Sequence, residues 1–239
     1  MPPDASLKMP RSAASTASAR DPAGDRFTRI YVELRNRICT NRYPPGTVLN
    51  ESELAVEFGL SRTPIRSVLQ KLNHDGLVET RNGVGTFVSE VNNRTAEDLY
   101  RLRMKLAELI GDFSASVDPT VHIPKFESLL QRAGKLGAKP DFEAIGQINV
   151  AVADAIADLT ESAALRELTT LLYFRTARIW HKTIPDLNWD EECTLIKAEL
   201  NEILRALRMG DVAGVGFIRR NFIAMASSRL QRVMRSRHA

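Results

Sequence analysis

Side chains able to bind a polyanion cluster between residues 61 and 70 of this 239-residue chain. Apolar residues recur there at spacings of three, four and seven, which predicts a helix with one buried side; they are Ile65, Val68, Leu69 and Leu72. The residues off that side carry hydroxyl, amide or guanidinium groups: Ser61, Arg62, Thr63, Arg66 and Gln70. Guanidinium groups donate to phosphates and to guanine edges, and hydroxyls donate to phosphates. We therefore expect the exposed side of this helix to contact DNA.

A shorter helix is predicted immediately before it. Asn50 followed by Glu53 is a helix-start signal, because both side chains can accept backbone N–H groups of the first turn. Gly59 then ends that helix in a left-handed conformation. Ser61 is expected to cap the second helix, with Pro64 in its first turn, where a missing N–H costs little. Two helices joined in this way are typical of the helix-turn-helix that enters the DNA major groove.

The sequence pattern changes after Gly76. Residues 77–81 and 85–88 are β-prone and flank Asn82 and Gly83, which together signal a hairpin. A glycine at such a tip also lets the backbone approach another backbone closely. An ordinary hairpin turn would use the same residues, so the sequence alone leaves open whether this tip has a second role.

Residues 27–91 resemble the winged-helix DNA-binding domain of GntR-family bacterial repressors. The elements that carry the resemblance are Pro45-Gly46, Glu53-Leu54-Ala55, Ser61-Arg62-Thr63-Pro64-Ile65-Arg66, Leu72, Asp75-Gly76-Leu77 and Asn82-Gly83. The resemblance implies that the hairpin is a wing and that its tip, Asn82 and Gly83, touches the minor groove.

The amino-acid composition narrows the class of protein further. The net charge is +4 and 44% of the residues are apolar, enough to fill a core. Cys39 and Cys193 lie far apart and predict buried thiols, not a disulfide framework. No apolar run approaches the ~20 residues of a membrane span, and no secretory segment is recognisable. We expect a cytoplasmic protein that binds no membrane, with residues 1–26, rich in Ala, Ser and Pro, as a disordered tail.

The rest of the chain is predicted to be helical, so the expected fold class is mainly α. An amphipathic helix over residues 27–40 leads into the winged helix-turn-helix, and a helical bundle over residues 92–239 follows it. The periodic segments of the bundle cover residues 99–113, 126–136, 142–159, 165–179, 189–207 and 212–233. Helix boundaries are expected at the prolines Pro119, Pro124, Pro140 and Pro185.

A winged helix followed by an all-helical partner resembles the FadR branch of the family, whose effector-binding and dimerisation domain is called FCD. Residues 205–215 are similar to the closing segment of those domains. FCD domains commonly hold a divalent metal through one Asp and three His. The resemblance places these ligands at Asn149, Ala153, Leu200 and Phe222, which do not form a competent ligand set. We therefore expect no metal and no cofactor.

Polar side chains that interrupt the apolar patterns are the candidate effector-binding residues. They are Arg103, Asn149 and Arg175, together with His181 beside Trp180. A buried Arg without a partner is too costly to persist, so each needs either an internal carboxylate or a bound anion. Both alternatives stay open. Favourable charge at a helix end explains the basic residues near the C-terminus: Arg229, Arg232, Arg235 and Arg237.

These features predict a sequence-specific transcriptional regulator, a repressor, that binds double-stranded DNA and is controlled by a small anionic metabolite. A homodimer is expected, because two recognition helices related by two-fold symmetry match a pseudo-palindromic operator. The alternatives are a small-molecule enzyme built on the helical domain and a non-specific DNA-binding protein. An enzyme is disfavoured because the sequence has no phosphate-binding loop, nucleophile elbow or zinc-protease motif.

Overall fold

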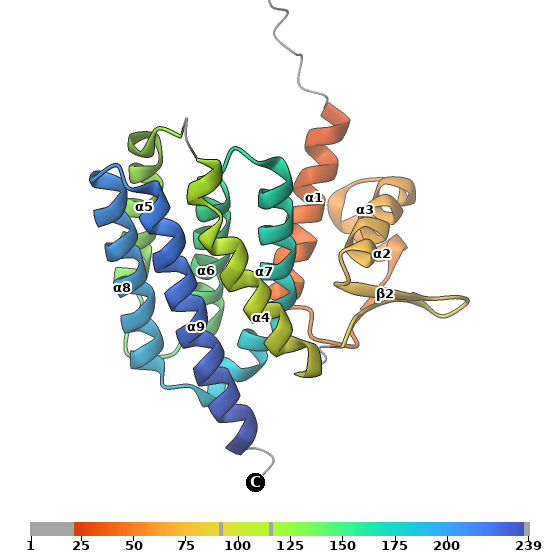
Figure 1. Cartoon of the computed structure of the whole chain (residues 1–239). Coiled ribbons are helices and arrows are strands. Elements are labelled where there is room, and N and C mark those ends of the chain that lie inside the picture. Colours follow the sequence, from red (N-terminus) through yellow and green to blue (C-terminus); the bar gives the residue numbers. More distant parts are fainter. Residues whose placement is uncertain (1–21, 91–92, 115–116, 237–239) are drawn as a thin grey trace, which may run out of the picture.

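The computed structural model describes residues 22–90, 93–114 and 117–236. Figure 1 shows a helical bundle on one side and a small helix-and-hairpin unit on the other, with the first helix between them. This arrangement confirms the expected fold class: a winged helix-turn-helix followed by a helical bundle. Within the described ranges, no helix is both long enough and apolar enough to cross a membrane.

The N-terminal unit has three helices and a three-stranded sheet. In chain order its elements are α1 (Pro22–Cys39), β1 (Val48–Leu49), α2 (Glu51–Phe58), α3 (Arg62–His74), β2 (Val78–Arg81) and β3 (Gly85–Val88). The strands are antiparallel in the order β1-β3-β2, and Arg81 pairs with Gly85 at the hairpin end. The two residues of β1 were not predicted as a strand, since so short a segment shows no alternation. Helix α1 begins at Pro22, so residues 22–26 are helical and not part of a tail; residues 1–21 lie outside the described residues.

The predicted helix starts are confirmed in part. The Asn50 side chain accepts the N–H groups of Ser52 at 2.8 Å and Glu53 at 3.4 Å, as a capping residue should. Gly59 ends α2 with φ 65°, in the left-handed region. Ser61 occupies the N-cap position of α3, but its side chain makes no capping hydrogen bond, so that part of the prediction is wrong.

The bundle contains six α-helices within the described residues. They are α4 (Asn93–Glu108), α5 (Pro119–Gly134), α6 (Phe142–Ala157), α7 (Ala163–Thr183), α8 (Trp189–Arg208) and α9 (Val212–Ser236). Short 3-10 turns, η1 (Gly111–Phe113) and η2 (Ile184–Asp186), follow α4 and α7. Pro124 does not mark a boundary as predicted. It lies inside α5, where it removes one helix hydrogen bond that the surrounding packing tolerates.

The two units share a hydrophobic core at their junction. One cluster of buried residues fills the bundle, and a second fills the winged helix. The second cluster also contains Val150 and Ala153 of α6 and Tyr173, Phe174 and Ala177 of α7. The N-terminal unit therefore packs on α6 and α7 through its helix α1.

Candidate nucleic-acid interface and ligand pocket

Helix α3 has the two faces that the sequence predicts. Its apolar residues Ile65, Val68, Leu69 and Leu72 are buried. All the residues predicted to contact DNA from this helix are exposed: Ser61, Arg62, Thr63, Arg66 and Gln70. Helices α2 and α3 and the hairpin lie on the side of α1 away from the bundle (Figure 1). The polar face of α3 is thus free to enter a groove.

A carboxylate on α2 holds the two arginines of α3. Glu51 Oε1 accepts from Arg66 Nε at 2.9 Å, and Glu51 Oε2 accepts from Arg66 Nη2 at 2.8 Å. Arg62 Nη2 lies farther away, 3.5 Å from the same Oε2. The hydrogen bonds from Arg66 hold the pKa of the Glu51 carboxyl below its usual value, against the opposing effect of partial burial. Sequence reasoning missed Glu51, although its position directly after the capping Asn50 was readable.

The hairpin places the predicted wing tip in solvent. Asn82 and Gly83 form the turn between β2 and β3, both are exposed, and Gly83 has φ 73°. A positive φ explains the glycine without any ligand. Arg81, beside the turn, is exposed, pairs with Glu79 and lies 4.9 Å from the Phe87 ring centroid. Figure 1 shows the hairpin projecting away from the bundle.

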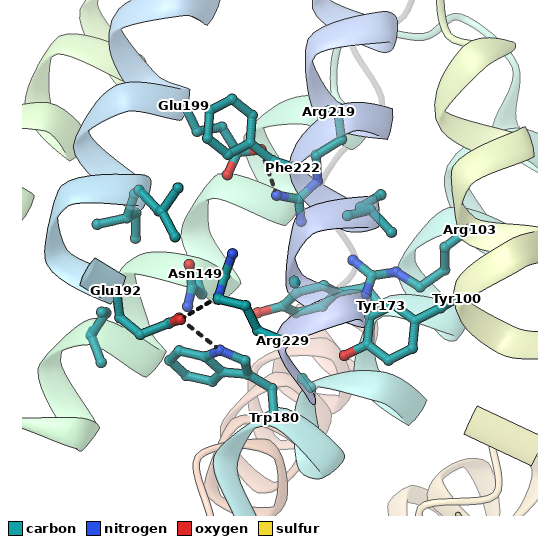
Figure 2. A pocket seen from close by; sticks show the side chains of 16 residues that line it. Tyr100, Arg103, Asn149, Tyr173, Trp180, Glu192, Glu199, Arg219, Phe222 and Arg229 are labelled. Carbon is teal, nitrogen blue, oxygen red and sulfur yellow. Dashed lines mark hydrogen bonds and ion pairs between the residues drawn. The ribbon is translucent and has the colours of Figure 1, made fainter. Parts of the chain in front are cut away.

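A cavity of about 90 Å³ lies inside the bundle and is lined from five helices, α4, α6, α7, α8 and α9. A buried water needs ~10–15 Å³ of such space, so the cavity has room for a small molecule. Aromatic side chains of Tyr100, Tyr173 and Trp180 form part of its wall (Figure 2). The charged lining residues are Arg103, Glu192, Glu199, Arg219 and Arg229.

Four of these charges form two buried ion pairs. Arg219 Nη1 lies 2.7 Å from Glu199 Oε1, and Arg229 Nε lies 2.7 Å from Glu192 Oε1. The other oxygen of Glu192 accepts the Trp180 indole N–H at 3.1 Å. Burial alone would lower the pKa of Arg219, but the adjacent Glu199 outweighs burial and leaves that pKa raised. Figure 2 shows both pairs as cross-links between α8 and α9.

Arg103 differs from the other two arginines, because no carboxylate among the described residues pairs with it. Its side chain reaches in from α4, is 9% exposed and donates from Nη1 to Thr176 Oγ1 at 2.7 Å. The guanidinium lies 5.4 Å and 5.3 Å from the ring centroids of Tyr100 and Tyr173. Burial, reinforced by nearby Arg219, lowers the pKa of Arg103 to about 10, so it remains a cation at neutral pH. With three arginines and two glutamates, the pocket carries one uncompensated positive charge.

The structure separates the four predicted effector-binding residues. Arg103 and Asn149 line the cavity. Arg175 and His181 do not. Arg175 Nε instead donates to the Asp75 backbone carbonyl at 3.0 Å, on the winged helix. The His181 ring packs on the α6 backbone at Gly146, where an added Cβ would lie 2.1 Å from the ring, and burial lowers its pKa to about 4.

The helical pattern missed most of the charged lining. Arg229 was expected to be a solvated charge at a helix end, but it is buried in the pocket. Arg219 was not singled out at all. Glu192 and Glu199 were the available signal, because they lie seven residues apart on the face of α8 that also carries the apolar Ile196.

None of the positions aligned with family metal ligands carries a His, Cys, Asp or Glu side chain. Asn149 and Phe222 line the cavity, whereas Ala153 lies in the shared core and Leu200 is fully buried in the bundle core. Among the described residues, no group of three or more His, Cys, Asp or Glu side chains is placed to hold a metal ion. The guanidinium groups on the pocket wall would also repel a divalent cation. This residue set does not fit a metal.

Helix α7 contacts both the pocket and the winged helix. Its Tyr173, Ala177 and Trp180 line the cavity. Arg178, on the other side of the helix, donates from Nη1 to Ser89 Oγ at 2.9 Å and from Nη2 to the Ser89 carbonyl. Ser89, just after wing strand β3, donates its hydroxyl hydrogen to the Gly76 carbonyl at 2.8 Å. One helix therefore joins the cavity wall to the base of the wing.

Comparisons with known proteins match the N-terminal unit. The family model described as bacterial regulatory proteins, gntR family, matches residues 27–88. An uncharacterized HTH-type transcriptional regulator of Streptomyces ambofaciens is 37% identical over 108 residues, 44% of this chain and 45% of that protein. The fatty acid metabolism regulator protein of Edwardsiella ictaluri is 43% identical over 76 residues, 31% of this chain and 29% of that protein. The chain thus spans less than half the length of these two curated relatives.

Solved structures match both units. The Escherichia coli protein McbR/YncC has a TM-score of 0.70 at 22% identity, covering 87% of this chain and 97% of that one. A putative transcriptional regulator GntR from Rhodococcus sp. RHA1 has a TM-score of 0.65 at 22% identity, covering 87% and 98%. At this identity the likeness shows a shared fold. The relatives are named as transcriptional regulators, not enzymes, and residues 27–88 match the gntR family of bacterial regulatory proteins.

Proposed function

We propose that this protein is a dimeric, operator-specific repressor whose DNA binding is controlled by a small carboxylate held in the bundle cavity. In this proposal residues 27–91 read DNA, and residues 92–239 form an effector-binding and dimerisation domain of the FadR branch. The observation that carries the proposal is Arg103, a buried cation with a hydroxyl partner and no carboxylate partner among the described residues. A bound anion would supply the missing charge.

The cavity narrows the ligand class. Its size admits a compact organic acid, and Tyr100 and Tyr173 flank the guanidinium that would receive the carboxylate. Asn149 provides an amide for a second polar group. The paired arginines, Arg219 and Arg229, are already satisfied by their glutamates. A monocarboxylate therefore matches the single unpaired charge better than a dianion does.

Helix α7 supplies a route from ligand to DNA. The Arg103 donor contacts Thr176, one residue before Ala177 on the cavity wall. A carboxylate that takes hydrogen bonds from Arg103 competes with Thr176, and α7 is then free to adopt a different position. Arg175 and Arg178 would carry this displacement to Asp75, directly after α3, and to Ser89. A ligand that favours the displaced arrangement lowers the population able to bind an operator.

The dimer would use the face that α4 and α9 share. Apolar side chains are exposed there: Leu102, Leu109, Phe113, Phe217 and Met225. Figure 1 shows α4 and α9 lying side by side on one face of the bundle, and a second copy would cover that face. Two-fold pairing then presents two α3 helices to two half-sites.

Selection from randomised DNA duplexes tests this function directly. The full chain should enrich one inverted-repeat sequence and bind it at least ~10³-fold more tightly than random duplex. A panel of small monocarboxylates should then contain compounds that release the selected duplex and change Trp180 fluorescence. If no sequence is enriched, the protein is a non-specific DNA-binding protein and not an operator-specific repressor. Sequence preference without any carboxylate response would remove the effector part of the proposal.

A further inference from the structure

Glu51 contacts the two arginines on which DNA reading by α3 depends. It is the first residue of α2, directly after the capping Asn50, and its side chain is 24% exposed. We propose that Glu51 is a positioning residue, which fixes Arg66 to read a base edge and leaves Arg62 free to bind a phosphate. The proposal rests on the proposed docking of α3 in the major groove.

The argument for Arg66 starts from which of its hydrogens are in use. Glu51 takes the Nε hydrogen and one Nη2 hydrogen through two nearly parallel bonds of 2.9 Å and 2.8 Å. The second Nη2 hydrogen and both Nη1 hydrogens remain. The free Nη2 hydrogen and one of the Nη1 hydrogens lie on the terminal edge of the guanidinium, which matches the O6 and N7 acceptors of guanine. Arg66 can therefore keep Glu51 and bind a guanine at the same time.

Arg62 is held differently. Its Nη2 has a single contact to Glu51, at 3.5 Å, and its side chain is 62% exposed. One long contact does not fix the plane of a guanidinium, whereas two short ones do. A phosphate accepts from many directions and needs no fixed plane. The asymmetry between the two arginines thus assigns base reading to Arg66 and backbone contact to Arg62.

Local charge supports a carboxylate at this position even though DNA is anionic. Glu51 lies at the N-terminus of α2, where the helix dipole and free N–H groups favour a negative charge. The hydrogen bonds from Arg66 keep its pKa low, so it stays ionised. Arg62, Arg66 and Glu51 together carry one net positive charge, so the cluster still attracts a phosphate backbone.

A matched pair of substitutions separates positioning from simple charge. Glu53 is exposed in the same first turn of α2, and within the described residues it forms no ion pair. Glu51→Gln and Glu53→Gln each remove one negative charge, but only Glu51→Gln breaks the paired bonds to Arg66. Affinities of the full-length variants are measured for the duplex selected by the wild-type protein and for random duplex, at several salt concentrations.

The quantity to compare is the ratio of the affinity for the selected duplex to the affinity for random duplex. Glu53→Gln should strengthen both affinities together and leave the ratio unchanged. Glu51→Gln should lower the ratio about tenfold, the lower part of the range for one bidentate base contact. Arg66→Ala should lower it at least as much, and adding Glu51→Gln to Arg66→Ala should lower it no further. Arg62→Ala should weaken both affinities alike and reduce the salt slope by about one.

Several outcomes would overturn the inference. If Glu51→Gln and Glu53→Gln have the same ratio of selected-duplex to random-duplex affinity, the contact of Glu51 with Arg66 is an ordinary surface ion pair without a positioning role. A loss of ratio in Arg62→Ala but not in Arg66→Ala would reverse the assignment. If Glu51→Gln lowers the thermal midpoint by many degrees, the Arg66→Ala and Arg62→Ala comparison still decides, because neither variant alters α2. Failure of the wild-type protein to select any sequence would instead remove the proposed function itself.

Discussion

Arg178 of α7 and Ser89 after wing strand β3 are joined by two hydrogen bonds, from Nη1 to the hydroxyl at 2.9 Å and from Nη2 to the carbonyl. Arg178 is only 7% exposed. Burial lowers the pKa of Arg178, with Cys39 and Glu90 opposing this effect. The bundle therefore holds the base of the wing through a desolvated side chain on the helix that also lines the cavity.

Replacing Arg178 by Ala should uncouple the two units. We expect the variant to bind both its selected operator and the carboxylate, but the ligand should change operator affinity less than threefold. Loss of the buried bonds should also cost about 1–3 kcal/mol of stability. Gel shifts with and without ligand measure the coupling, and Arg205→Ala, an exposed arginine on α8, is the control. Full ligand response in Arg178→Ala would show that the signal travels elsewhere.

The proposed dimer face can be disrupted by one charge. Phe217→Glu on α9 places a carboxylate at a residue that is 56% exposed in one chain and would be buried between two. We expect light scattering at micromolar concentration to report a dimer for the wild-type protein and a monomer for this variant. Met209→Glu, at a still more exposed residue after α8, should leave the mass unchanged. A dimer in Phe217→Glu would place the interface on another face.

The buried ion pair of Arg229 and Glu192 should contribute more to the free energy of unfolding than an exposed pair does. Arg229→Met leaves a buried carboxylate with only the Trp180 N–H, and we expect a loss of about 3–5 kcal/mol in urea unfolding. Arg208→Met breaks an exposed pair with Glu127 of the same 2.7 Å length, and should cost less than about 1 kcal/mol. Adding Glu192→Gln to Arg229→Met should restore part of the loss. Equal losses in the two arginine variants would contradict this account.

The element types were predictable because each segment repeats its apolar residues at one clear period. The stripe of Ile65, Val68 and Leu72 specifies both the helix and the face that it buries. The features that were missed depend on distant partners. Strand β1 exists because Val48 and Leu49 pair with β3, some forty residues later, and Pro124 stays helical because the rest of α5 packs on α8.

The pocket was predictable only in part, since a stripe shows that a residue is buried but not what covers it. Arg103 and Arg175 both interrupt apolar stripes in the sequence. Tyr100 and Tyr173 pack near Arg103, whereas the backbone of the winged helix covers Arg175. The distinction arises from the packing of α7 between two units. Arg175 lies on α7 and Arg103 on α4, and no local pattern in either helix encodes which unit each arginine will meet.

His181 should make stability fall as the pH is lowered. Burial lowers its folded-state pKa to about 4, against an ordinary value of 6.5, so protonation favours the unfolded chain. The contribution of the neutral His181 ring to the free energy of unfolding is complete above pH 6.5 and is lost progressively down to pH 4. Between pH 7.5 and pH 5 this loss amounts to about 2 kcal/mol. Urea unfolding of His181→Leu at the two pH values should show a drop smaller by that amount, and an unchanged drop would contradict the assignment.

Arg103→Met is expected to separate ligand binding from stability. The variant removes a buried guanidinium that no carboxylate of the described residues pairs with, so the free protein should be at least as stable as the wild type. Thr176 loses one donor but keeps its own bonds to backbone carbonyls on α7.

Carboxylate affinity in Arg103→Met should fall by a factor of about 10 to 150, the effect of losing a charged hydrogen-bonding partner. Calorimetric titration of the best ligand from the panel measures this fall. The neutral amide of the same acid should bind the wild-type protein and the variant almost equally, because only the carboxylate gains from the guanidinium. Arg101→Met, at an exposed position two residues earlier on α4, is the control. Undiminished carboxylate binding in Arg103→Met would mean that the unpaired cation is not the anion site.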